Sequence, residues 1–318
     1  SKTAYGLAGY RSAITGKSYV FVTQRTENKI AQLELVDAGG GKVGATLVRT
    51  LTAPAPASGS AQFEGLVVDK DTGYLYAGQE DVGIWKFGAE PTAGTTGVLI
   101  HALGANSPSI RKPDVEGLTI YYGPNGTGYL LASNQGENTF AVFTREGNNE
   151  YLGSFAVGAN TALGIDSDEE SDGADVVSVS VGPFTQGLLV VQDGNNDPAF
   201  LDNDGGEISN ISGNFKYIPW ENVAATFAKP STLPNGVASG DTTQNSTVLW
   251  TRSTAPGAVT FQYSTSANFA TIAGTRTGTV TDITLPVKVD VTGLNPNTTY
   301  YYRATDASGA SATGQFRT

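Results

Sequence analysis

The sequence predicts an all-β chain made of a partial β-propeller followed by a C-terminal β-sandwich. Three observations predict this fold: a strand pattern that repeats four times, a change of pattern after a Pro-rich stretch near residue 230, and little helical periodicity outside residues 220–225. Of the 318 residues, 39% are hydrophobic, which is enough for one or two cores, and 40 Gly and 14 Pro supply turns.

The repeat consists of an apolar strand, a Gly turn, a second apolar strand, a polar turn and a third strand. The second strands lie at residues 19–22, 74–77, 129–132 and 188–191, and the glycines before them are 57, 55 and 59 residues apart. Third strands lie at 30–35, 82–87, 140–143 and 215–218, and fourth strands at 47–51, 98–100 and 151–155. This spacing predicts about four four-stranded blades, and a β-sandwich with long loops is the alternative.

A domain boundary is predicted at a polar, Pro-rich linker. Residues 229–236 would join a propeller domain at 1–228 to a second domain at 237–318. In the second domain, a Gly-Leu-Asn-Pro turn at 293–296 leads into a Tyr-rich strand at 300–302. This pattern is typical of the tyrosine corner of immunoglobulin-like sandwiches, with Trp250 as a core residue. We therefore expect a fibronectin type III-like or Ig-like β-sandwich without catalytic residues.

The composition excludes several kinds of chemistry. The chain has no Cys and one His, which leaves no thiol nucleophile, no zinc–thiolate site and no two-histidine metal motif. His101 falls in an apolar strand and is expected to be structural. The first 232 residues carry 26 acidic and 14 basic side chains. This charge disfavours nucleic acid and favours hard cations such as Ca²⁺, and no apolar run is long enough for a membrane span.

Polar residues recur at equivalent positions of the repeats. Tyr5, Glu64, Glu116 and Asp175 lie at the starts of the first strands, and Arg25, Glu80, Gln135 and Asp193 follow the second strands. Because the innermost strands of successive blades surround one axis, we expect a single ring at one mouth of the channel. Crowded carboxylates repel one another unless they are protonated or a cation neutralises them, so the ring predicts calcium.

The segment at residues 166–175 contains six carboxylates in ten positions. It is not an EF-hand, because flanking helices and the terminal bidentate Glu are missing. A solvated acidic loop is the alternative. The segment lies just before the fourth repeat, however, so the repeat predicts that it reaches the ring. That position favours a metal-binding loop.

The segments that contain these residues resemble the β-propeller phytases. The resemblance is carried by residues 5–6, 63–65, 80–91, 114–122, 132–136, 172–175, 192–194 and 214–221, and it runs from about Ala4 to Ala224. It implies a six-bladed propeller fold and a calcium-dependent phosphatase that acts on phytate, inositol hexakisphosphate.

The resemblance also implies roles for individual residues. It implies that several active-site calcium ions are held by Glu64, Glu80, Asp114, Glu116 and Asp166. Further calcium positions are implied at Gln135, Asp172, Asp193 and Asn196. Tyr5 would contact phosphate, and Arg25 stands where the family usually has a phosphate-binding Lys, which keeps the charge but changes its geometry. Catalysis would use water activated at the metal and held by Glu64, Glu80 and Glu116, with phytate or another phosphomonoester as substrate.

The resemblance covers four of the six blades of the family. The family's chain begins well before Tyr5, so we expect the remaining blades to come from the rest of a longer chain or from another copy. Residues 233–241 and 248–252 resemble the N-terminal domain of PhoD-type alkaline phosphatases. Together these features imply a secreted or periplasmic bacterial enzyme that scavenges phosphate.

Two other functions stay open. A non-catalytic extracellular calcium-binding scaffold or adhesion fragment would show calcium-dependent melting without phosphatase activity. A carbohydrate-binding propeller would present aromatic platforms at its rim, but the aromatic residues, 9% of the chain, fall mostly at apolar strand positions.

Overall fold

The computed structural model describes residues 3–197, 201–204, 207–210, 213–227 and 231–318. The chain divides into two compact units, Ser1–Lys229 and Pro230–Thr318. In the described residues, helical structure is confined to α1 (Trp220–Ala224) and two 3-10 turns at Pro124–Gly126 and Gln135–Glu137. None of these helices is long and apolar enough to cross a membrane. The predicted all-β fold class, a partial propeller followed by a sandwich, is confirmed.

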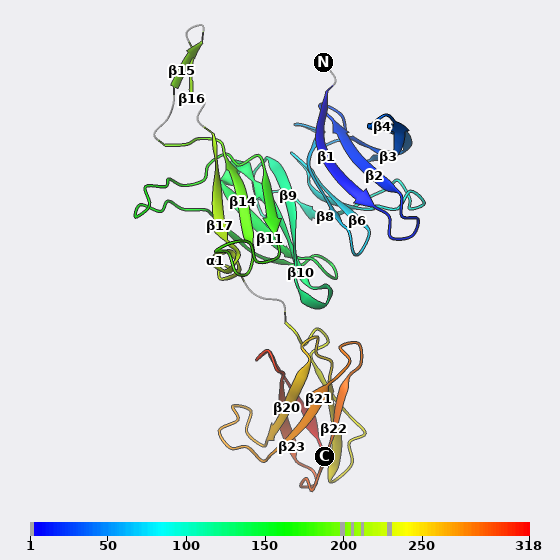
Figure 1. Cartoon of the computed structure of the whole chain (residues 1–318). Helices are drawn as coiled ribbons and strands as arrows, with labels where there is room; N and C mark the ends of the chain where they lie inside the picture. The colour runs from blue at the N-terminus through cyan, green and yellow to red at the C-terminus, as the bar shows by residue number, and fades with distance from the viewer. Residues whose placement is uncertain (1–2, 198–200, 205–206, 211–212, 228–230) are drawn as a thin grey trace. The chain divides into compact units, whose positions relative to one another are not determined.

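Three four-stranded antiparallel sheets follow one another in the first unit (Figure 1). The first contains β1 (Ala4–Arg11), β2 (Ser18–Gln24), β3 (Lys29–Gly39) and β4 (Lys42–Thr52). The second contains β5 (Phe63–Asp69), β6 (Tyr74–Gln79), β7 (Gly83–Gly88) and β8 (Val98–Ala102). The third contains β9 (Val115–Tyr122), β10 (Gly128–Asn134), β11 (Thr139–Thr144) and β12 (Tyr151–Phe155). In each sheet the strands pair in chain order, as propeller blades do.

The fourth sheet of this unit has three strands in the described residues. These are β13 (Ala174–Val177), β14 (Leu188–Asp193) and β17 (Asn214–Pro219), while β15 (Leu201–Asp204) and β16 (Glu207–Asn210) form a separate hairpin. The first strands of neighbouring sheets pack together, β1 on β5, β5 on β9 and β9 on β13. The starts of these strands are therefore brought to one centre.

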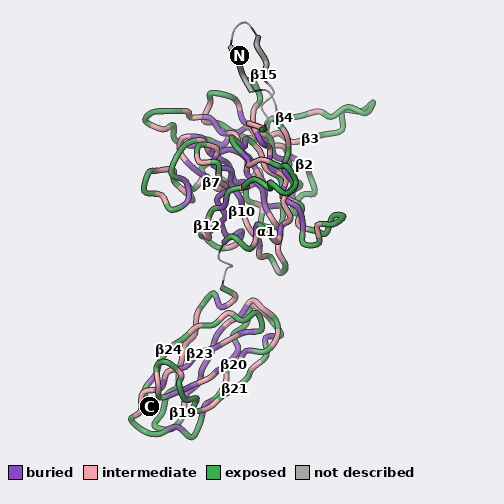
Figure 2. The backbone as a smooth tube through the Cα atoms, turned by 90° about the vertical axis from the view of Figure 1, so that its left-hand side faces the viewer, coloured by how far each residue is buried: buried purple, intermediate pink, exposed green. Residues whose placement is uncertain are grey.

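Burial differs between the inner and the outer sheets of the unit. Most residues of β6 and β10 are buried, because their sheets have a neighbour on each face (Figure 2). The first and fourth sheets instead expose apolar side chains on one face. Leu7 of β1 is 66% exposed, and Phe215 and Tyr217 of β17 are 63% and 64% exposed.

The second unit is a β-sandwich of two sheets. One contains β18 (Val237–Gly240), β19 (Ser246–Thr251) and β22 (Val287–Thr292). The other contains β21 (Gly274–Val280), β20 (Gly257–Ser264), β23 (Thr299–Thr305) and β24 (Ser311–Arg317). The tyrosine corner forms as expected, because Tyr300 is buried and its hydroxyl accepts a hydrogen bond of 3.0 Å from the amide of Asn295.

The core position predicted for Trp250 is wrong. Along β19 the inward positions alternate, and they fall on Thr247, Leu249 and Thr251. Leu249 therefore fills the core, while Trp250 is half-buried on the other face and pairs with Lys288 of β22. A one-residue difference in register moves a strand residue to the opposite face.

The domain boundaries at 1–228, 229–236 and 237–318 stay a prediction. Lys229 and Pro230 lie outside the described residues. The described end of the linker packs on the sandwich, since Leu233 is 4% exposed and the amide of Thr254 donates a 2.9 Å hydrogen bond to the carbonyl of Thr232.

Candidate metal centre

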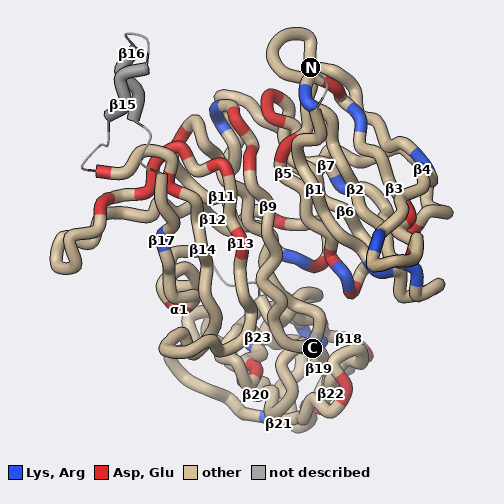
Figure 3. Tube along the Cα trace, turned by 45° about the horizontal axis from the view of Figure 1, so that its top comes forward, with Lys and Arg blue, Asp and Glu red and all other residues tan. Residues whose placement is uncertain are grey.

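Three glutamates converge at one end of the first unit. One carboxylate oxygen of each of Glu64, Glu80 and Glu116 lies within 4.8 Å of the others. Calcium–oxygen bonds of about 2.3–2.6 Å place two ligands of one ion at most about 5 Å apart, so a single cation can reach all three. Acidic residues gather at this end, near the starts of β5 and β9 and the loop before β13 (Figure 3).

The first strands approach one another closely because a glycine follows each of Tyr5, Glu64 and Glu116. A Cβ on Gly6 would lie 1.9 Å from the carbonyl oxygen of Glu64, and a Cβ on Gly65 would lie 1.9 Å from that of Glu116. Only glycine allows the first strands to approach so closely. The pairing of β5 with β6 also shifts register between Phe63 and Leu66, which marks a bulge at Glu64.

The repeat predicts Asp175 in this ring, but the structure places its side chain elsewhere. The strand β13 begins at Ala174 and pairs with β14 in unbroken register, without the bulge of β5. Asp175 instead accepts a hydrogen bond of 3.0 Å from the hydroxyl of Thr119 on β9.

Asp172 occupies the fourth position of the ring. Its carbonyl accepts a 3.1 Å hydrogen bond from the amide of Gly117, and its charge acts on Glu116. The sequence signal for this position is an acid followed by Gly. The pair Glu116-Gly117 recurs as Asp172-Gly173, and aligning the repeats on the pair would have found it.

The protein leaves two of the three glutamates incompletely hydrogen-bonded. Burial raises the pKa of Glu116 to about 10, with further contributions from the hydrogen bond and charge of Glu64. Burial also raises the pKa of Glu80. Glu64 Oε2 and Glu116 Oε2 are buried and have no hydrogen-bond partner among the residues described. Such a cluster must hold protons or take up a cation.

Gln62 is a residue of the site that the sequence argument missed. It is buried and donates a hydrogen bond from Nε2 to Glu80 Oε1. Its own Oε1 accepts a hydrogen bond of 2.8 Å from the amide of Thr26. Gln62 thus fixes the orientation of Glu80, and nothing in its sequence context distinguishes it from an ordinary loop glutamine.

Tyr5 and Arg25 lie together beside the glutamates. The Tyr5 hydroxyl is hydrogen-bonded to Glu64, and burial together with this contact raises the pKa of the phenol. Arg25 Nη2 donates to the Tyr5 hydroxyl at 3.4 Å, and the guanidinium carbon lies 4.5 Å from the centre of the Tyr5 ring. This exposed cation is placed next to a buried acidic site.

Asp114, Gln135 and Asp172 surround the same centre. Burial and the charges of Asp81 and Glu64 raise the pKa of Asp114. Burial and the charges of Glu64 and Glu170 raise that of Asp172. Gln135 Nε2 donates a 2.5 Å hydrogen bond to Asp172 Oδ1. Their roles as calcium ligands stay a prediction.

The remaining predicted residues form a second group around Lys216. Lys216 Nζ makes ion pairs with Asp166 and, at 2.9 Å, with Asp193. Burial favours a higher pKa for Asp166, but the hydrogen bonds from Lys216 and from the amide of Asp197 lower it overall. Asn196 Oδ1 accepts a hydrogen bond from Asn214.

Together, the fold and the site define an all-β chain of the propeller type whose blades gather carboxylates that could hold a metal ion. A family model described as phytase matches residues 1–242. The chain belongs to the phytase family. The C-terminal part, residues 221–318, matches a model described as the N-terminal domain of PhoD-like phosphatases, and the two matches confirm the resemblances noted in the sequence.

A curated relative is the 3-phytase of Bacillus subtilis (strain 168). It is 40% identical over 222 residues, which are 69% of this chain and 53% of the relative. The chain therefore spans about half the length of this relative.

Two solved structures are similar over different extents. A structure of PhoD is 29% identical with a TM-score of 0.25, over 28% of this chain and 19% of PhoD. An engineered GH43 glycoside hydrolase is 13% identical with a TM-score of 0.38, over 99% of this chain and 79% of the hydrolase. At these TM-scores neither structure bears on the function.

Proposed function

We propose that this chain carries the site of a calcium-dependent phosphomonoester hydrolase that releases phosphate from phytate, and that it acts outside the cell or in the periplasm. The proposal rests on the convergence of Glu64, Glu80 and Glu116 within 4.8 Å in a chain of the phytase family. The named activity of the Bacillus subtilis relative supports the substrate class.

The residues fit a hard cation. Glu64 Oε2 and Glu116 Oε2 are buried and lack a hydrogen-bond partner in the part of the chain that is described. Both belong to carboxylates, which are the ligands that Ca²⁺ prefers. Glu64, Glu80 and Glu116 would hold the ion, and Asp114, Gln135 and Asp172 are the candidates for further positions.

When bound, a divalent cation supplies positive charge that offsets the phosphate oxygens and lowers the pKa of water. The protein contributes the orientation of the ester. Arg25 presents a charged fork beside the site, and the contact of its guanidinium with the Tyr5 ring helps to hold it there. The Tyr5 hydroxyl donates its single proton to Glu64, so it would donate to a phosphate oxygen only once a cation occupies that carboxylate.

Proton transfer falls to the glutamates. In the metal-free chain, burial raises the pKa of Glu116, so its carboxyl holds a proton near neutral pH. A bound cation would displace that proton and leave a carboxylate that can accept another. It is therefore suited to accept the proton of the attacking water, at Oε2, the oxygen without a partner among described atoms. A covalent phospho-enzyme is not needed.

A non-catalytic calcium-binding scaffold is the alternative function. The same glutamates would then bind calcium only to join the first strands of neighbouring sheets. This alternative is favoured by the exposed apolar faces of the first and fourth sheets, such as Leu7 and Tyr217, which are surfaces suited to a protein partner.

The test is phosphate release from calcium–phytate by the wild type and by Glu116→Gln. We expect the substitution to lower the rate at least about 100-fold, because it removes a charged group from the reacting centre. Asp175→Asn is the matched control, since Asp175 is a carboxylate of the neighbouring strand that bonds to Thr119 instead.

Equal rates in the wild type and in Glu116→Gln would overturn the role of Glu116. A wild type that binds calcium but releases no phosphate would overturn the proposed activity and leave the scaffold. A large loss in Asp175→Asn would contradict the position of Asp172, rather than Asp175, in the ring.

A further inference from the structure

A buried glutamine connects the turn that carries Arg25 to one of the clustered glutamates. Gln62 is 9% exposed and directly precedes β5. Its Oε1 accepts a 2.8 Å hydrogen bond from the amide of Thr26, and its Nε2 donates a hydrogen bond to Glu80 Oε1. One side-chain amide therefore bonds to the turn between β2 and β3 in the first sheet and to the turn between β6 and β7 in the second sheet.

The two partners determine which way the side-chain amide of Gln62 faces. A backbone N–H can only donate a hydrogen bond, so the oxygen of the amide must face Thr26. The NH₂ group of the amide then faces Glu80, whose carboxylate oxygen accepts the second bond. Reversing the amide would break both bonds, so Gln62 has one favourable orientation.

The backbone around Gln62 reinforces the contact with Glu80. The carbonyl of Gln62 accepts a 3.3 Å hydrogen bond from the amide of Glu80, and the amide of Gln62 donates one of 3.3 Å to Ser60 Oγ. The hydroxyl of Ser60 is hydrogen-bonded to Glu80 as well. The amide of Ser60 donates to the carboxylate of Asp81, which fixes this segment from the other side. Glu80 is thereby held by the segment of residues 60–62 through both backbone and side-chain contacts.

The turn that carries Arg25 depends on the contact between Thr26 and Gln62. Thr26 has a φ of 69°, in the left-handed region that a β-branched residue rarely adopts. Such a conformation persists only where surrounding contacts hold it. The amide of Arg25 donates a 3.0 Å hydrogen bond to the carbonyl of Thr3, just before β1, whereas the amide of Thr26 reaches Gln62 in front of the neighbouring sheet. The contact with Gln62 therefore fixes this turn relative to the second sheet.

We propose that Gln62 is a positioning residue that holds Arg25 and Glu80 in register with each other. Arg25 is kept where a phosphate group would bind, and Glu80 is kept where a divalent cation would bind. The inference rests on the proposed function, because that function assigns these tasks to Arg25 and Glu80. Gln62 acts through its two neighbours, so its removal should weaken calcium binding and phosphate binding through separate contacts.

The test compares Gln62→Met with the wild type, with CaCl₂ and phytate as probes. Methionine keeps the approximate length of the side chain and removes both of its hydrogen bonds. Calorimetric titration measures calcium affinity without turnover, and we expect this affinity to fall about 10–100-fold, the usual effect of removing a group that orients a metal ligand. In saturating calcium we expect KM for phytate to stay raised about 10-fold while kcat recovers, because excess calcium refills the site but does not restore the turn of Arg25.

Two further variants separate the contacts of Gln62. Ser60→Ala removes a hydrogen bond to Glu80 and leaves the one between Gln62 and Thr26. It should therefore lower calcium affinity without raising KM. Arg25→Ala should raise KM in the wild type and raise it much less in Gln62→Met, because the guanidinium is no longer held in place there.

Gln32→Met is the matched control. Gln32 is a fully buried glutamine of β3, which donates a 2.8 Å hydrogen bond to the carbonyl of Ala89 and accepts one of 2.6 Å from Arg49. Its substitution should lower the melting temperature but leave calcium affinity and KM unchanged. If Gln62→Met is too unstable to assay, Gln62→Asn takes its place, since asparagine is one methylene too short to reach both partners.

The proposal is overturned if the Gln62 variant binds calcium and phytate as Gln32→Met does, or if its effect on KM simply adds to that of Arg25→Ala. A wild type that releases no phosphate is a failure of the proposed function and is recognised separately. Calcium titration then still tests the contact with Glu80, and calorimetric binding of phytate in calcium tests the contact with the Arg25 turn, because neither measurement requires turnover.

Discussion

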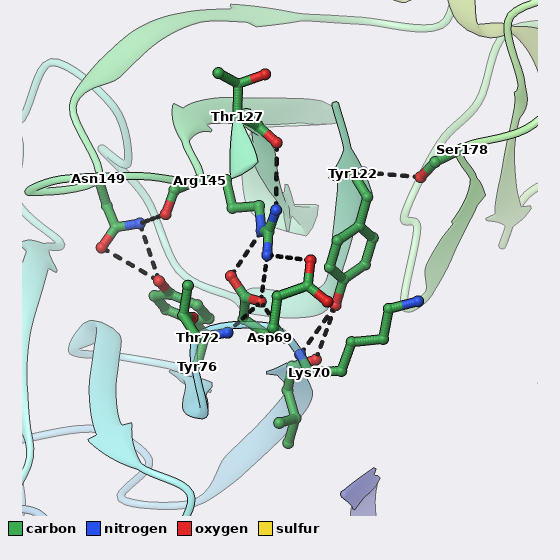
Figure 4. Close-up of polar contacts among 11 residues, drawn as sticks. Asp69, Lys70, Thr72, Tyr76, Tyr122, Thr127, Arg145, Asn149 and Ser178 are labelled. Atoms are coloured by element: carbon green, nitrogen blue, oxygen red, sulfur yellow. Dashed lines mark hydrogen bonds and ion pairs between the residues drawn. The ribbon is translucent and has the colours of Figure 1, made fainter. Parts of the chain in front are cut away.

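The strand β5 carries a buried acidic cluster at each of its ends, and the two clusters are built in opposite ways. At its last residue, Asp69 receives two hydrogen bonds of 2.7 Å from Arg145, whose Nη2 also lies 2.7 Å from Asp71 (Figure 4). At its second residue, Glu64 faces two other glutamates, and the exposed Arg25 is stacked on the neighbouring Tyr5.

The carboxylate pKa values at the two ends of β5 are shifted in opposite directions. Burial by itself would raise the pKa of Asp69, but the hydrogen bonds from Arg145 and Thr72 lower it. At the other end, burial and the neighbouring glutamates raise the pKa of Glu116 to about 10. A buried carboxylate that the protein satisfies holds two sheets together, whereas one that it leaves unsatisfied is available for a ligand.

The largest expected effect is the loss of stability on removing Arg145. Arg145 follows β11 and is 1% exposed, so Arg145→Met leaves the buried Asp69 without a counter-charge. We expect the free energy of unfolding to fall by about 3–5 kcal/mol. Urea unfolding followed by circular dichroism measures this change.

Arg111→Met is the control for this measurement. Arg111 pairs with Glu137 at 3.1 Å, but its side chain is 62% exposed, so the loss should be at most about 1 kcal/mol. Equal losses of stability in the two variants would mean that burial does not make the Arg145–Asp69 ion pair more important than the exposed Arg111–Glu137 pair.

The next effect is a pH dependence of stability at the Glu116 end. Without divalent cations, Glu116 binds its proton more tightly in the folded chain than in the unfolded chain, where its pKa is near 4.5. The resulting stabilisation is complete below about pH 4.5 and is lost as the pH rises towards about 10. In EDTA we therefore expect the free energy of unfolding to fall as the pH rises from about 5 to about 9, by less than the loss expected for Arg145→Met.

Glu116→Gln should reduce this slope, since glutamine does not titrate, while the raised pKa values of Glu80, Asp114 and Asp172 leave a smaller dependence of the same sign. Saturating calcium should reverse the slope in the wild type, because cation binding displaces the proton and is favoured at high pH. The Asp69 end has the opposite sign: its lowered pKa gives stability that is present above about pH 4 and is lost as the pH falls. A wild type whose stability in EDTA is independent of pH would refute the difference between the two ends.

The sequence predicted the fold better than it predicted the site. The strand repeat and the turn glycines are local features, and β2, β6, β10 and β14 contain the second strands that they indicate. The equivalent positions at the starts of the first strands also identified Glu64 and Glu116, and each is followed by the glycine that a close approach between strands requires. These signals depend on backbone conformation, which short stretches of sequence determine.

The rest depends on contacts between distant segments. Asp175 was placed in the ring because the repeat was assumed to be regular, and the absence of a bulge in β13 moved that position to Asp172. Lys216 has no sequence signal, because it is an ordinary strand residue until β17 pairs with β14. Gln62 could not be told from an ordinary loop glutamine until its contacts with two neighbouring sheets were known.

The smallest expected effect is the loss of stability on removing the hydroxyl of Tyr122. The ring of Tyr122 contacts both Lys70 and Arg145 at the Asp69 end of β5. Its hydroxyl accepts a 3.2 Å hydrogen bond from the amide of Lys70 and lies 3.3 Å from the carbonyl of Val68. Its ring centre lies 4.4 Å from the guanidinium carbon of Arg145. Tyr122→Phe keeps the ring and removes only the hydroxyl.

We expect Tyr122→Phe to lower the free energy of unfolding by about 1 kcal/mol, which is the net contribution of a hydrogen bond of this kind. Urea unfolding of this variant beside Arg145→Met separates the hydroxyl from the ion pair. A loss as large as that of Arg145→Met would mean that the hydroxyl, and not the counter-charge, holds this end of β5. A small loss would instead identify the Arg145–Asp69 ion pair as the main contact at this end of β5. The Glu64 end has no such ion pair within the described residues, and its carboxylates are therefore available for a ligand.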